Sequence, residues 1–456
     1  MRHRVRHRMR NPRRAALAGA ALGAVALAAC GAPGGDGDGR RTVTYWLWDA
    51  NQQPAYQECA DDFEAANPGY DIVIEQRGWD HYWTALALGF VAESAPDVFT
   101  DHLSTFPEWV SRGLLLPLDE YVERDGVPLD RYEPGLAELW VGQDGRRYGL
   151  PKDWDTVGIF YNREMLAEAG VDEAELAELT WNPDDGGTFE DLVARLTVDA
   201  HGVRGDEPGF DRNDVAVHGL WLEMDGGFNH GQTQYSIYAA ANGWQATDVN
   251  PWGERFNFDD PALLEAVDWW RGLIDKGYMP PLAAQEGVQS SDQLAAGTAA
   301  MATNGSWMIG TFHGYEGLDV GIAPTPTGPT GERASMFNGL ADSIHAGTDD
   351  PEAAWRWVSY LASPACQRVV AEHRVVFPAI TEAWELAREA FAADGIDVEP
   401  FTRQVTEGTT FLFPITQHAA DVAAIMAPAF EAVLSGAPLS TLERANEEVN
   451  ALFRTG

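Results

Sequence analysis

Tryptophan, amide and carboxylate side chains recur in this sequence where a polyhydroxylated ligand could be bound. The chain has 17 tryptophans, more than the packing of two ordinary domains requires. A sugar presents C–H bonds on each ring face and hydroxyls around its edge. Its site therefore needs aromatic platforms together with planar polar groups. These residue types predict the chemistry of a carbohydrate site.

The first candidate residues follow predicted strands. Trp46 and Trp48 alternate with Leu47 and share one face of the segment 42–48. We expect Trp48 and the following Asp49 to contact the ligand, and Trp46 to lie in the core. Ligands in open α/β sheets gather at the carboxyl ends of strands. The candidates that follow the second and third predicted strands are Trp79, Asp101 and His102. For any one of these acids, the alternative is a solvated loop carboxylate.

The sequence lacks the common signatures of catalysis and metal binding. It has no phosphate-binding loop, no Ser-His-Asp signature, no HExxH pair and no Cys/His spacing suited to a metal. We therefore expect no cofactor, no metal and no enzymatic reaction.

Strand-like and helix-like segments alternate from residue 42 onward. Strands are predicted at 42–48, 71–75, 96–99 and 157–161, and helices at 54–67, 106–113 and 261–277. This alternation predicts mainly parallel sheets covered by helices. The glycine- and proline-rich passage GIAPTPTGPTG, at 321–331, is expected to connect two domains.

The N-terminal segment has the layout of a secretory signal. Seven arginines precede the apolar run 15–29, which is too short to span a bilayer comfortably. The run ends in LAACG and resembles a bacterial lipobox, so residues 1–29 are predicted to be removed and Cys30 to be lipidated. An ordinary signal peptide that ends in a cysteine is the alternative. The glycine-rich residues 30–41 are expected to form a flexible tether, and the export route, Sec or twin-arginine, stays open.

The chain is strongly acidic, with 70 acidic and 31 basic residues, and seven of the basic residues belong to the predicted signal. Such a surface repels nucleic acid and anionic lipid headgroups. We expect no nucleic-acid partner, and attachment to the outer face of the cytoplasmic membrane through the lipid alone.

Two cysteines remain beside Cys30, namely Cys59 and Cys366. An oxidising compartment allows them to pair. Two separate buried thiols are the alternative, because the sequence does not give the distance between their Cα atoms.

Several segments share one order and spacing with a known family. The patterns are ECADDFEAANP at 58–68, SAPDV at 94–98, GRRYGLP at 145–151, NGSW at 304–307, and the stretches 79–83, 113–118, 158–162, 297–301 and 350–364. Together they resemble the extracellular solute-binding proteins of ABC importers, specifically the maltose-binding-like group. The resemblance extends from about residue 42 to the C-terminus.

The resemblance implies a type II periplasmic-binding-protein-like α/β fold. Each of two lobes would be a mainly parallel sheet flanked by helices, with the ligand cleft between the lobes. The first lobe is expected to hold 42–150 plus 333–383, and the second 151–332 plus 384–456. Cys59 and Cys366 would then share the first lobe, which favours the disulfide.

The resemblance also adds residues to the candidate site. Asp155 follows the expected hinge crossing at 150–151, where this family often places an acidic ligand, and Trp307 matches a position that often stacks on a sugar ring. The further candidates, in the second lobe and near the return to the first, are Gln232, Tyr235, Trp244, Asn304, Asn338 and Asp342.

The function implied is capture of a neutral mono- or oligosaccharide by a monomer that delivers it to the transmembrane subunits of an ABC permease. A glycerol phosphate ligand would need a basic cluster, and Lys152 is the only lysine near the hinge. One alternative is a lipid-anchored glycoside hydrolase with a carboxylate pair such as Asp101 and Asp155. A surface sensor or adhesin is another.

Overall fold

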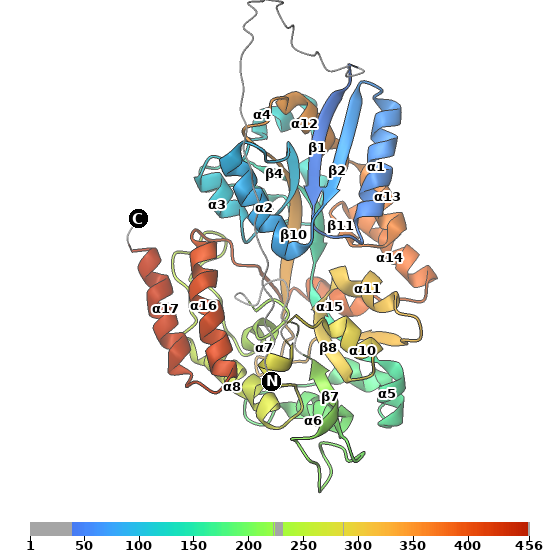
Figure 1. Cartoon of the computed structure of the whole chain (residues 1–456), viewed down its shortest axis with the longest axis vertical. Helices are drawn as coiled ribbons and strands as arrows, with labels where there is room; N and C mark the ends of the chain where they lie inside the picture. The colour runs from blue at the N-terminus through green and yellow to red at the C-terminus, as the bar shows by residue number, and fades with distance from the viewer. Residues whose placement is uncertain (1–38, 222, 224–230, 286, 455–456) are drawn as a thin grey trace, which may run out of the picture. The chain divides into compact units, whose positions relative to one another are not determined.

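The computed structural model describes residues 39–221, 223, 231–285 and 287–454 (Figure 1). The predicted signal, Cys30 and most of the predicted tether lie outside the described residues. Within the described ranges, every helix is too short or too polar to cross a membrane.

The first sheet has the strand order β11-β4-β10-β3-β1-β2, and β12 pairs with β10. Its strands are β1 (Arg41–Leu47), β2 (Tyr70–Gln76), β3 (Val98–His102), β4 (Gly149–Asp155), β10 (Ser335–Ile344), β11 (Phe377–Pro378) and β12 (Thr410–Leu412). β1 is parallel to β2 and β3, whereas β10 is antiparallel to β3 and β4. All residues of β3, β4 and β10 are buried.

The second sheet has the order β6-β7-β8-β5-β9. Its strands are β5 (Val157–Asn162), β6 (Val198–Asp199), β7 (Val215–Trp221), β8 (Ala299–Gly305) and β9 (Val320–Ala323). Only the β7–β8 pairing among these strands is parallel.

The α/β class is confirmed, but the expectation of mainly parallel sheets is wrong, because both sheets are mixed. A helix that connects two consecutive strands makes them parallel only if both strands belong to the same sheet. This is the case for β1, β2 and β3. β4 leads through Thr156 into β5 of the second sheet, and β10 returns from the second sheet to the first. Strands that pass between the sheets in opposite directions lie antiparallel when they pair, as β4 and β10 do.

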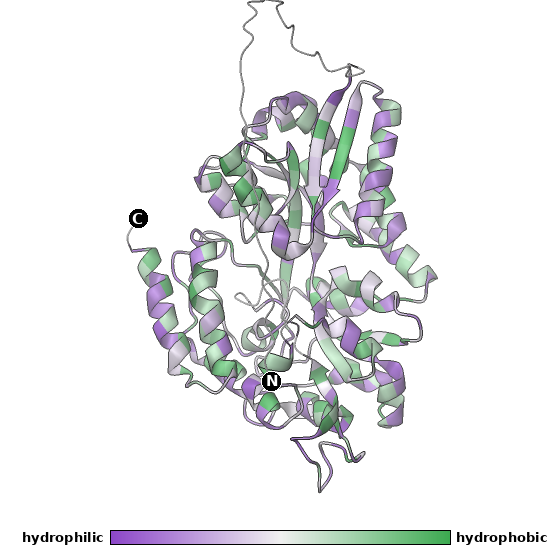
Figure 2. Ribbon diagram, in the orientation of Figure 1, coloured by the Kyte–Doolittle hydropathy of each residue, from purple (hydrophilic) through white to green (hydrophobic). Residues whose placement is uncertain are grey.

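Helices cover both sheets and carry hydrophobic and hydrophilic residues on the same ribbon (Figure 2), as helices with one buried face do. Those before β4 and after β10 are α1 (Gln53–Ala66), α2 (Trp79–Ala92), α3 (Phe106–Ser111), α4 (Asp119–Asp125), α12 (Pro351–Leu361), α13 (Pro364–His373), α14 (Thr381–Ala393), α15 (Glu399–Glu407), α16 (Ala419–Leu434) and α17 (Ser440–Leu452). Those between are α5 (Arg163–Glu168), α6 (Gly187–Leu196), α7 (Ser236–Ala241), α8 (Pro261–Asp275), α9 (Leu282–Gln285), α10 (Ser290–Ala295) and α11 (Ile309–His313). Short 3-10 turns are Leu129–Arg131, Glu138–Trp140, Glu173–Glu178 and Ser306–Met308.

The predicted helices and strands agree with the structure to within about three residues at their ends. Proline in the first turn starts α1, α8, α12 and α13, where its missing N–H costs no hydrogen bond. The Asp260 side chain accepts a hydrogen bond from the Ala262 N–H and so caps α8. The passage 321–331 begins within β9 of the second sheet and leads toward β10 of the first.

Two clusters of buried side chains form the interior. One holds Tyr45, Trp140 and Trp357 around the first sheet. It also includes Phe160 and Phe312 from the second part of the chain, by which we mean the second sheet and the segments between β4 and β10. The other holds Trp181 and Trp270 together with residues of α16 and α17. The lobe limits at 150 and 383 stay a prediction, and strand pairing places β4, as far as Asp155, in the first sheet.

A disulfide joins Cys59 on α1 to Cys366 on α13, with the two Cα atoms 5.2 Å apart. The pairing favoured by the sequence is therefore present.

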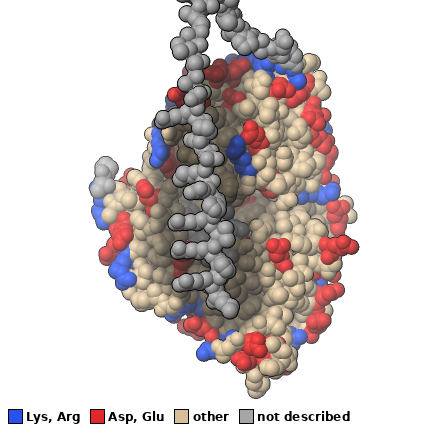
Figure 3. All heavy atoms as spheres, viewed as in Figure 1, with Lys and Arg blue, Asp and Glu red and all other residues tan. Residues whose placement is uncertain are grey.

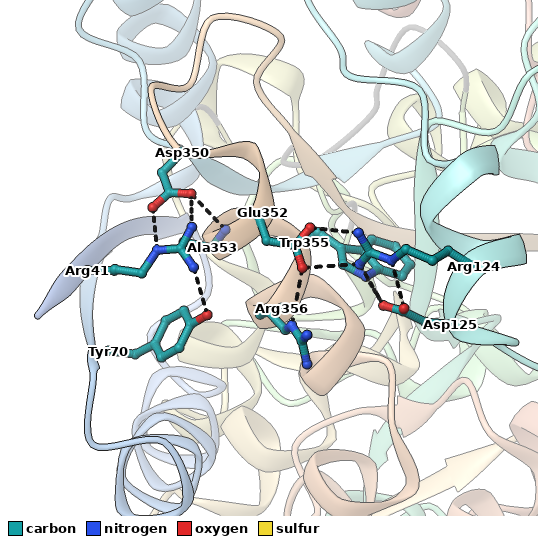
Figure 4. Close-up of polar contacts among 9 residues, drawn as sticks. All are labelled: Arg41, Tyr70, Arg124, Asp125, Asp350, Glu352, Ala353, Trp355 and Arg356. Carbon is teal, nitrogen blue, oxygen red and sulfur yellow. Dashed lines mark hydrogen bonds and ion pairs between the residues drawn. The ribbon is translucent and has the colours of Figure 1, made fainter.

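The start of β1 is fixed to α12 by charged contacts (Figure 4). The Arg41 guanidinium donates to both carboxylate oxygens of Asp350 and, at 3.1 Å, to the Tyr70 hydroxyl. Nearby, Arg124 donates to both oxygens of Glu352. Acidic side chains are spread widely over the face drawn in Figure 3, in keeping with the composition.

Candidate ligand-binding site

A cavity of about 320 Å³ is lined by residues from both sheets and from the loops that follow their strands. Nine of the residues predicted from the sequence line it: Trp48, Asp49, Trp79, His102, Asp155, Gln232, Asn304, Trp307 and Asn338. These residues come from positions almost 300 apart in the sequence, and the fold brings them together.

Four predicted residues do not line this cavity. Asp101 is fully buried and accepts hydrogen bonds from Thr105 and Ser343. Asp342 lies behind the cavity wall, 2.8 Å from the Tyr45 hydroxyl. Tyr235 and Trp244 belong to the second core, where Tyr235 stacks on Phe430 with ring centroids 4.3 Å apart and the Trp244 indole donates to the Asn257 carbonyl. Each of these four side chains is buried by packing within the fold.

Sequence reasoning missed other lining residues. They include Asn51, Gln52, Gln76, Asp153, Trp154, Glu223, Gln289, Ser306, Met308 and Thr311. Gln76 ends β2, so the rule that ligands gather at strand ends predicts it as well as it predicts Trp79. Asp153 lies two residues before Asp155 on β4, which is the strand period. Glu223 had no comparable signal.

Aromatic rings form one wall of the cavity. The Trp48 ring meets the Trp79 ring edge-on, with centroids 5.1 Å apart, and lies 5.2 Å from Trp83. His102 joins this cluster at 5.7 Å from Trp79 and meets Phe413, next to β12, at 5.0 Å. Packing of each ring against the others fixes its orientation and leaves the partly exposed faces of Trp48 and Trp79 toward the cavity.

Trp307 is positioned by the glycine two residues before it. A Cβ atom on Gly305 would lie 1.9 Å from the Trp307 ring. The indole therefore lies directly against the Gly305 backbone, and no larger residue fits there. Trp307 stays partly exposed on the short turn Ser306–Met308.

Asp155, at the end of β4, connects the two parts of the chain. Its Oδ1 accepts a hydrogen bond from Gln232 at 2.9 Å, and its Oδ2 accepts one from Asn338 on β10 at 3.0 Å. The same Asn338 nitrogen lies 3.2 Å from His102 Nε2. Burial, followed by the nearby charge of Asp153, raises the pKa of Asp155 well above its usual range.

A second polar cluster surrounds Glu223. Its Oε2 accepts hydrogen bonds from the Asn304 side chain at 2.9 Å and from the Ser290 hydroxyl. The Asn304 Oδ1 accepts from the Gly305 N–H at 2.8 Å. This cluster holds the amide of Asn304 in place on the cavity wall.

Asp49 and its neighbours form the rim. Asp49 accepts hydrogen bonds from the Asn51 N–H at 2.8 Å and the Gln52 side chain at 3.0 Å. The Asn51 side chain donates to the Thr311 hydroxyl on α11 at 3.0 Å, which links the loop after β1 to the second part of the chain. Burial raises the pKa of Asp49.

The cavity wall is acidic and rich in hydrogen-bond acceptors. Among the described residues that line it, four are carboxylates (Asp49, Asp153, Asp155 and Glu223) and none is lysine or arginine. Nowhere in the described ranges do three or more His, Cys, Asp or Glu side chains gather as they would to hold a metal ion.

Residues 58–396 match the family model described as bacterial extracellular solute-binding protein. The match covers most of the chain, so this protein belongs to the bacterial extracellular solute-binding protein family. Members of this family work outside the cytoplasm, and the same location applies to this chain.

Individual proteins are similar over nearly the whole chain. The maltodextrin-binding protein MdxE of Bacillus subtilis is 25% identical and covers 82% of both chains. The crystal structure of UspC from M. tuberculosis is 27% identical, with a TM-score of 0.69, and covers 90% of this chain and 100% of that chain. The ABC substrate-binding protein Lmo0181 of Listeria monocytogenes, solved with cycloalternan, is 20% identical, with a TM-score of 0.77 and 91% and 99% coverage. The expected two-lobed type II fold is thereby confirmed.

Proposed function

We propose that this protein captures a carbohydrate in the cavity and delivers it to the transmembrane subunits of an ABC permease. The observation that carries the proposal is the juxtaposition of Trp48, Trp79 and Trp307 with the Asp155 amide network in one cavity. Indole faces match the C–H faces of sugar rings, and carboxylate and amide groups match their hydroxyls. Two similar proteins, named above for maltodextrin or solved with cycloalternan, support the same chemistry.

The proposed ligand is a neutral mono- or oligosaccharide. Four Asp or Glu side chains and no lysine or arginine line the described part of the cavity. A phosphate or carboxylate group on the ligand would face these acidic side chains without a lysine or arginine to compensate its charge. Neutral hydroxyls instead donate to the carboxylates and amides.

The proposed mechanism is closure of the two lobes around the sugar, with the closed form selected by the ligand. The cavity draws residues from both sheets, and the Asn51–Thr311 and Asp155–Gln232 hydrogen bonds connect the two parts of the chain. We propose the lobes to be 42–150 plus 333–383 and 151–332 plus 384–456. The protein would act as a monomer, lipidated at Cys30 and held at the outer face of the membrane beside its permease.

A hydrolase that uses Asp101 and Asp155 does not fit the geometry, because Asp101 is fully buried away from the cavity. Incubation of the pure protein with neutral oligosaccharides tests this point. Steady release of reducing ends would overturn a pure binding function.

A thermal-shift screen tests the proposed function directly. A ligand that binds the native state raises its stability by mass action, by about 2.7 kcal/mol at a concentration 100 times its Kd. We expect neutral sugars to raise the Tm, and glycerol phosphate and sugar phosphates to leave it unchanged. A response to the phosphates alone, or to none of the sugars, would contradict the proposal.

A further inference from the structure

A segment from near the end of the chain backs the cavity wall at His102. β12 pairs in parallel with the start of β10, and the Phe413 N–H extends this pairing by donating to the Phe337 carbonyl at 3.0 Å. The Phe413 side chain is 1% exposed, and its ring meets the His102 ring at 90° with centroids 5.0 Å apart. Phe413 therefore lies directly against a side chain that lines the cavity.

The strand pairing of this segment ends after Phe413, because Pro414 has no backbone N–H. The Asn250 side chain supplies the next hydrogen bonds. Its Nδ2 donates to the Leu412 and Phe413 carbonyls, both at 3.0 Å, and its Oδ1 accepts from the Ile415 N–H at 3.1 Å. One planar amide thus pairs with three backbone groups, much as a neighbouring strand would. We call these three hydrogen bonds the Asn250 clamp.

Asn250 comes from the second part of the chain. It is half-buried and lies in the loop between α7 and α8. The backbone of the same loop is attached as well, because the Trp252 N–H donates to the Ile415 carbonyl at 2.7 Å. This backbone bond does not depend on the Asn250 side chain, so the loop should stay docked when Asn250 is replaced. The clamp can therefore be removed while the rest of the loop keeps its place.

Direct contacts lead from the Asn250 clamp to the cavity. The clamp holds the Phe413 backbone, and the Phe413 ring packs against His102. The His102 ring in turn lies 5.7 Å from the Trp79 ring, and its Nε2 lies 3.2 Å from the Asn338 side chain. A wall that is already ordered before binding spares the ligand the free-energy cost of ordering it. Loss of the clamp would loosen the packing behind His102 and restore that cost.

We propose that Asn250 is a positioning residue that never touches the ligand, and that it holds Phe413 against His102 and so preorganises the aromatic wall of the cavity. Asn250 is not among the described residues that line the cavity. The effect on the ligand rests on the proposed carbohydrate function. The control of His102 by Asn250 is testable on the protein without any sugar.

The first measurement is the NMR spectrum of the His102 ring in protein with isotope-labelled histidine and no added sugar. The signals are assigned by their absence from His102→Gln. The ring current of Phe413 acts on these signals, so Asn250→Ala should move them from their wild-type positions. Asn257→Ala is the matched control, because Asn257 lies in the same loop and its side chain donates to the Gln245 carbonyl at 3.0 Å, and it should leave them in place. Asn250→Asp, which keeps the acceptor for the Ile415 N–H and loses both donors, replaces Asn250→Ala should that variant not fold.

The second measurement is the Kd for maltotriose and for the neutral sugar with the largest thermal shift. Asn250→Ala should weaken binding by about 2- to 30-fold, the range for residues that act on a site through packed neighbours, and Asn257→Ala should bind as wild type does. If Asn250 acts through His102, Asn250→Ala should weaken binding clearly less in the His102→Gln background than in wild type.

Each result decides one part of the proposal. Unchanged His102 signals in both Asn250 variants would overturn the positioning role of Asn250. Shifted signals with an unchanged Kd would overturn the preorganisation of the wall for the ligand. An undiminished loss of affinity in the His102→Gln background would show that Asn250 acts by another route and would overturn the link through His102. If the wild type binds no neutral sugar, the proposed function fails, and the NMR result still decides the part played by Asn250.

Discussion

Replacing Trp307 by alanine should weaken sugar binding while leaving the fold intact. The indole is partly exposed on a short turn, lies against Gly305 and lines the cavity. It is not a member of either buried core cluster as the described residues define them. Its removal therefore takes away a ligand platform without opening a hole in the interior.

The size of the effect follows from the area that a sugar would cover. One ring face stacked on an indole buries roughly 60–80 Å² of apolar surface, which is worth about 1.5–2 kcal/mol at about 25 cal/mol per Å². A loss of this size weakens the Kd by about 10- to 30-fold. Trp307→Phe keeps a smaller ring in the same place and should lose less than half of this free energy.

Isothermal titration calorimetry with the best neutral sugar measures the effect, and urea unfolding of each variant checks the fold. Trp252→Ala is the matched control, because Trp252 is also a partly exposed tryptophan but lies outside the described cavity lining. If Trp307→Ala and Trp252→Ala bind the sugar as tightly as wild type, Trp307 is not a platform and the stacking argument is wrong.

Three further predictions concern the remaining features. Cys59→Ser with Cys366→Ser should lower the free energy of unfolding by about 2–5 kcal/mol, because the disulfide restricts the unfolded chain; two reactive thiols in the unreduced wild type would contradict this. Burial raises the pKa of Asp101 to about 7, so its contribution to stability is full below pH ~4, the value in the unfolded chain, and is lost as the pH rises to 7. The Asp101→Asn side chain cannot ionise. The free energy of unfolding of this variant minus that of wild type, both measured in urea, should therefore increase by up to about 4 kcal/mol between pH 4 and 7. A difference that does not change with pH would refute the argument. Cys30→Ser should appear in the culture medium as a sugar-binding protein, whereas retention on the membrane would rule out the lipid anchor.

The sequence predicted the site residues well at the ends of strands that converge on the cavity. It predicted them less well where the direction of a side chain decides whether the residue lines the cavity or is buried. His102 and Asp101 are consecutive residues of β3, so they point to opposite faces. His102 lines the cavity, whereas the Asp101 carboxylate accepts a hydrogen bond from Ser343 on β10. The choice between the two depends on which face of the first sheet borders the cavity, and the sequence of β3 alone does not give this.

The remaining differences have the same origin in long-range pairing. Alternating helices and strands predicted parallel sheets, but the direction of β10 depends on its return from the other sheet. Tyr235 was a candidate in the second lobe, yet Phe430 from α16 covers its ring.

The charged contacts at the start of β1 determine how the molecule would bear mechanical load. Arg40 pairs with Glu64 and Asp71, and Arg41 pairs with Asp350, so the first described residues are fastened to α1, β2 and α12. A pull on the preceding residues would load β1 along its length, and its parallel hydrogen bonds with β2 and β3 would resist in shear. None of these ion pairs involves a residue of β4, β5 or β10. Drag on the molecule would thus be carried by the β1–β2 side of the first sheet and not directly by the strands that connect the two sheets.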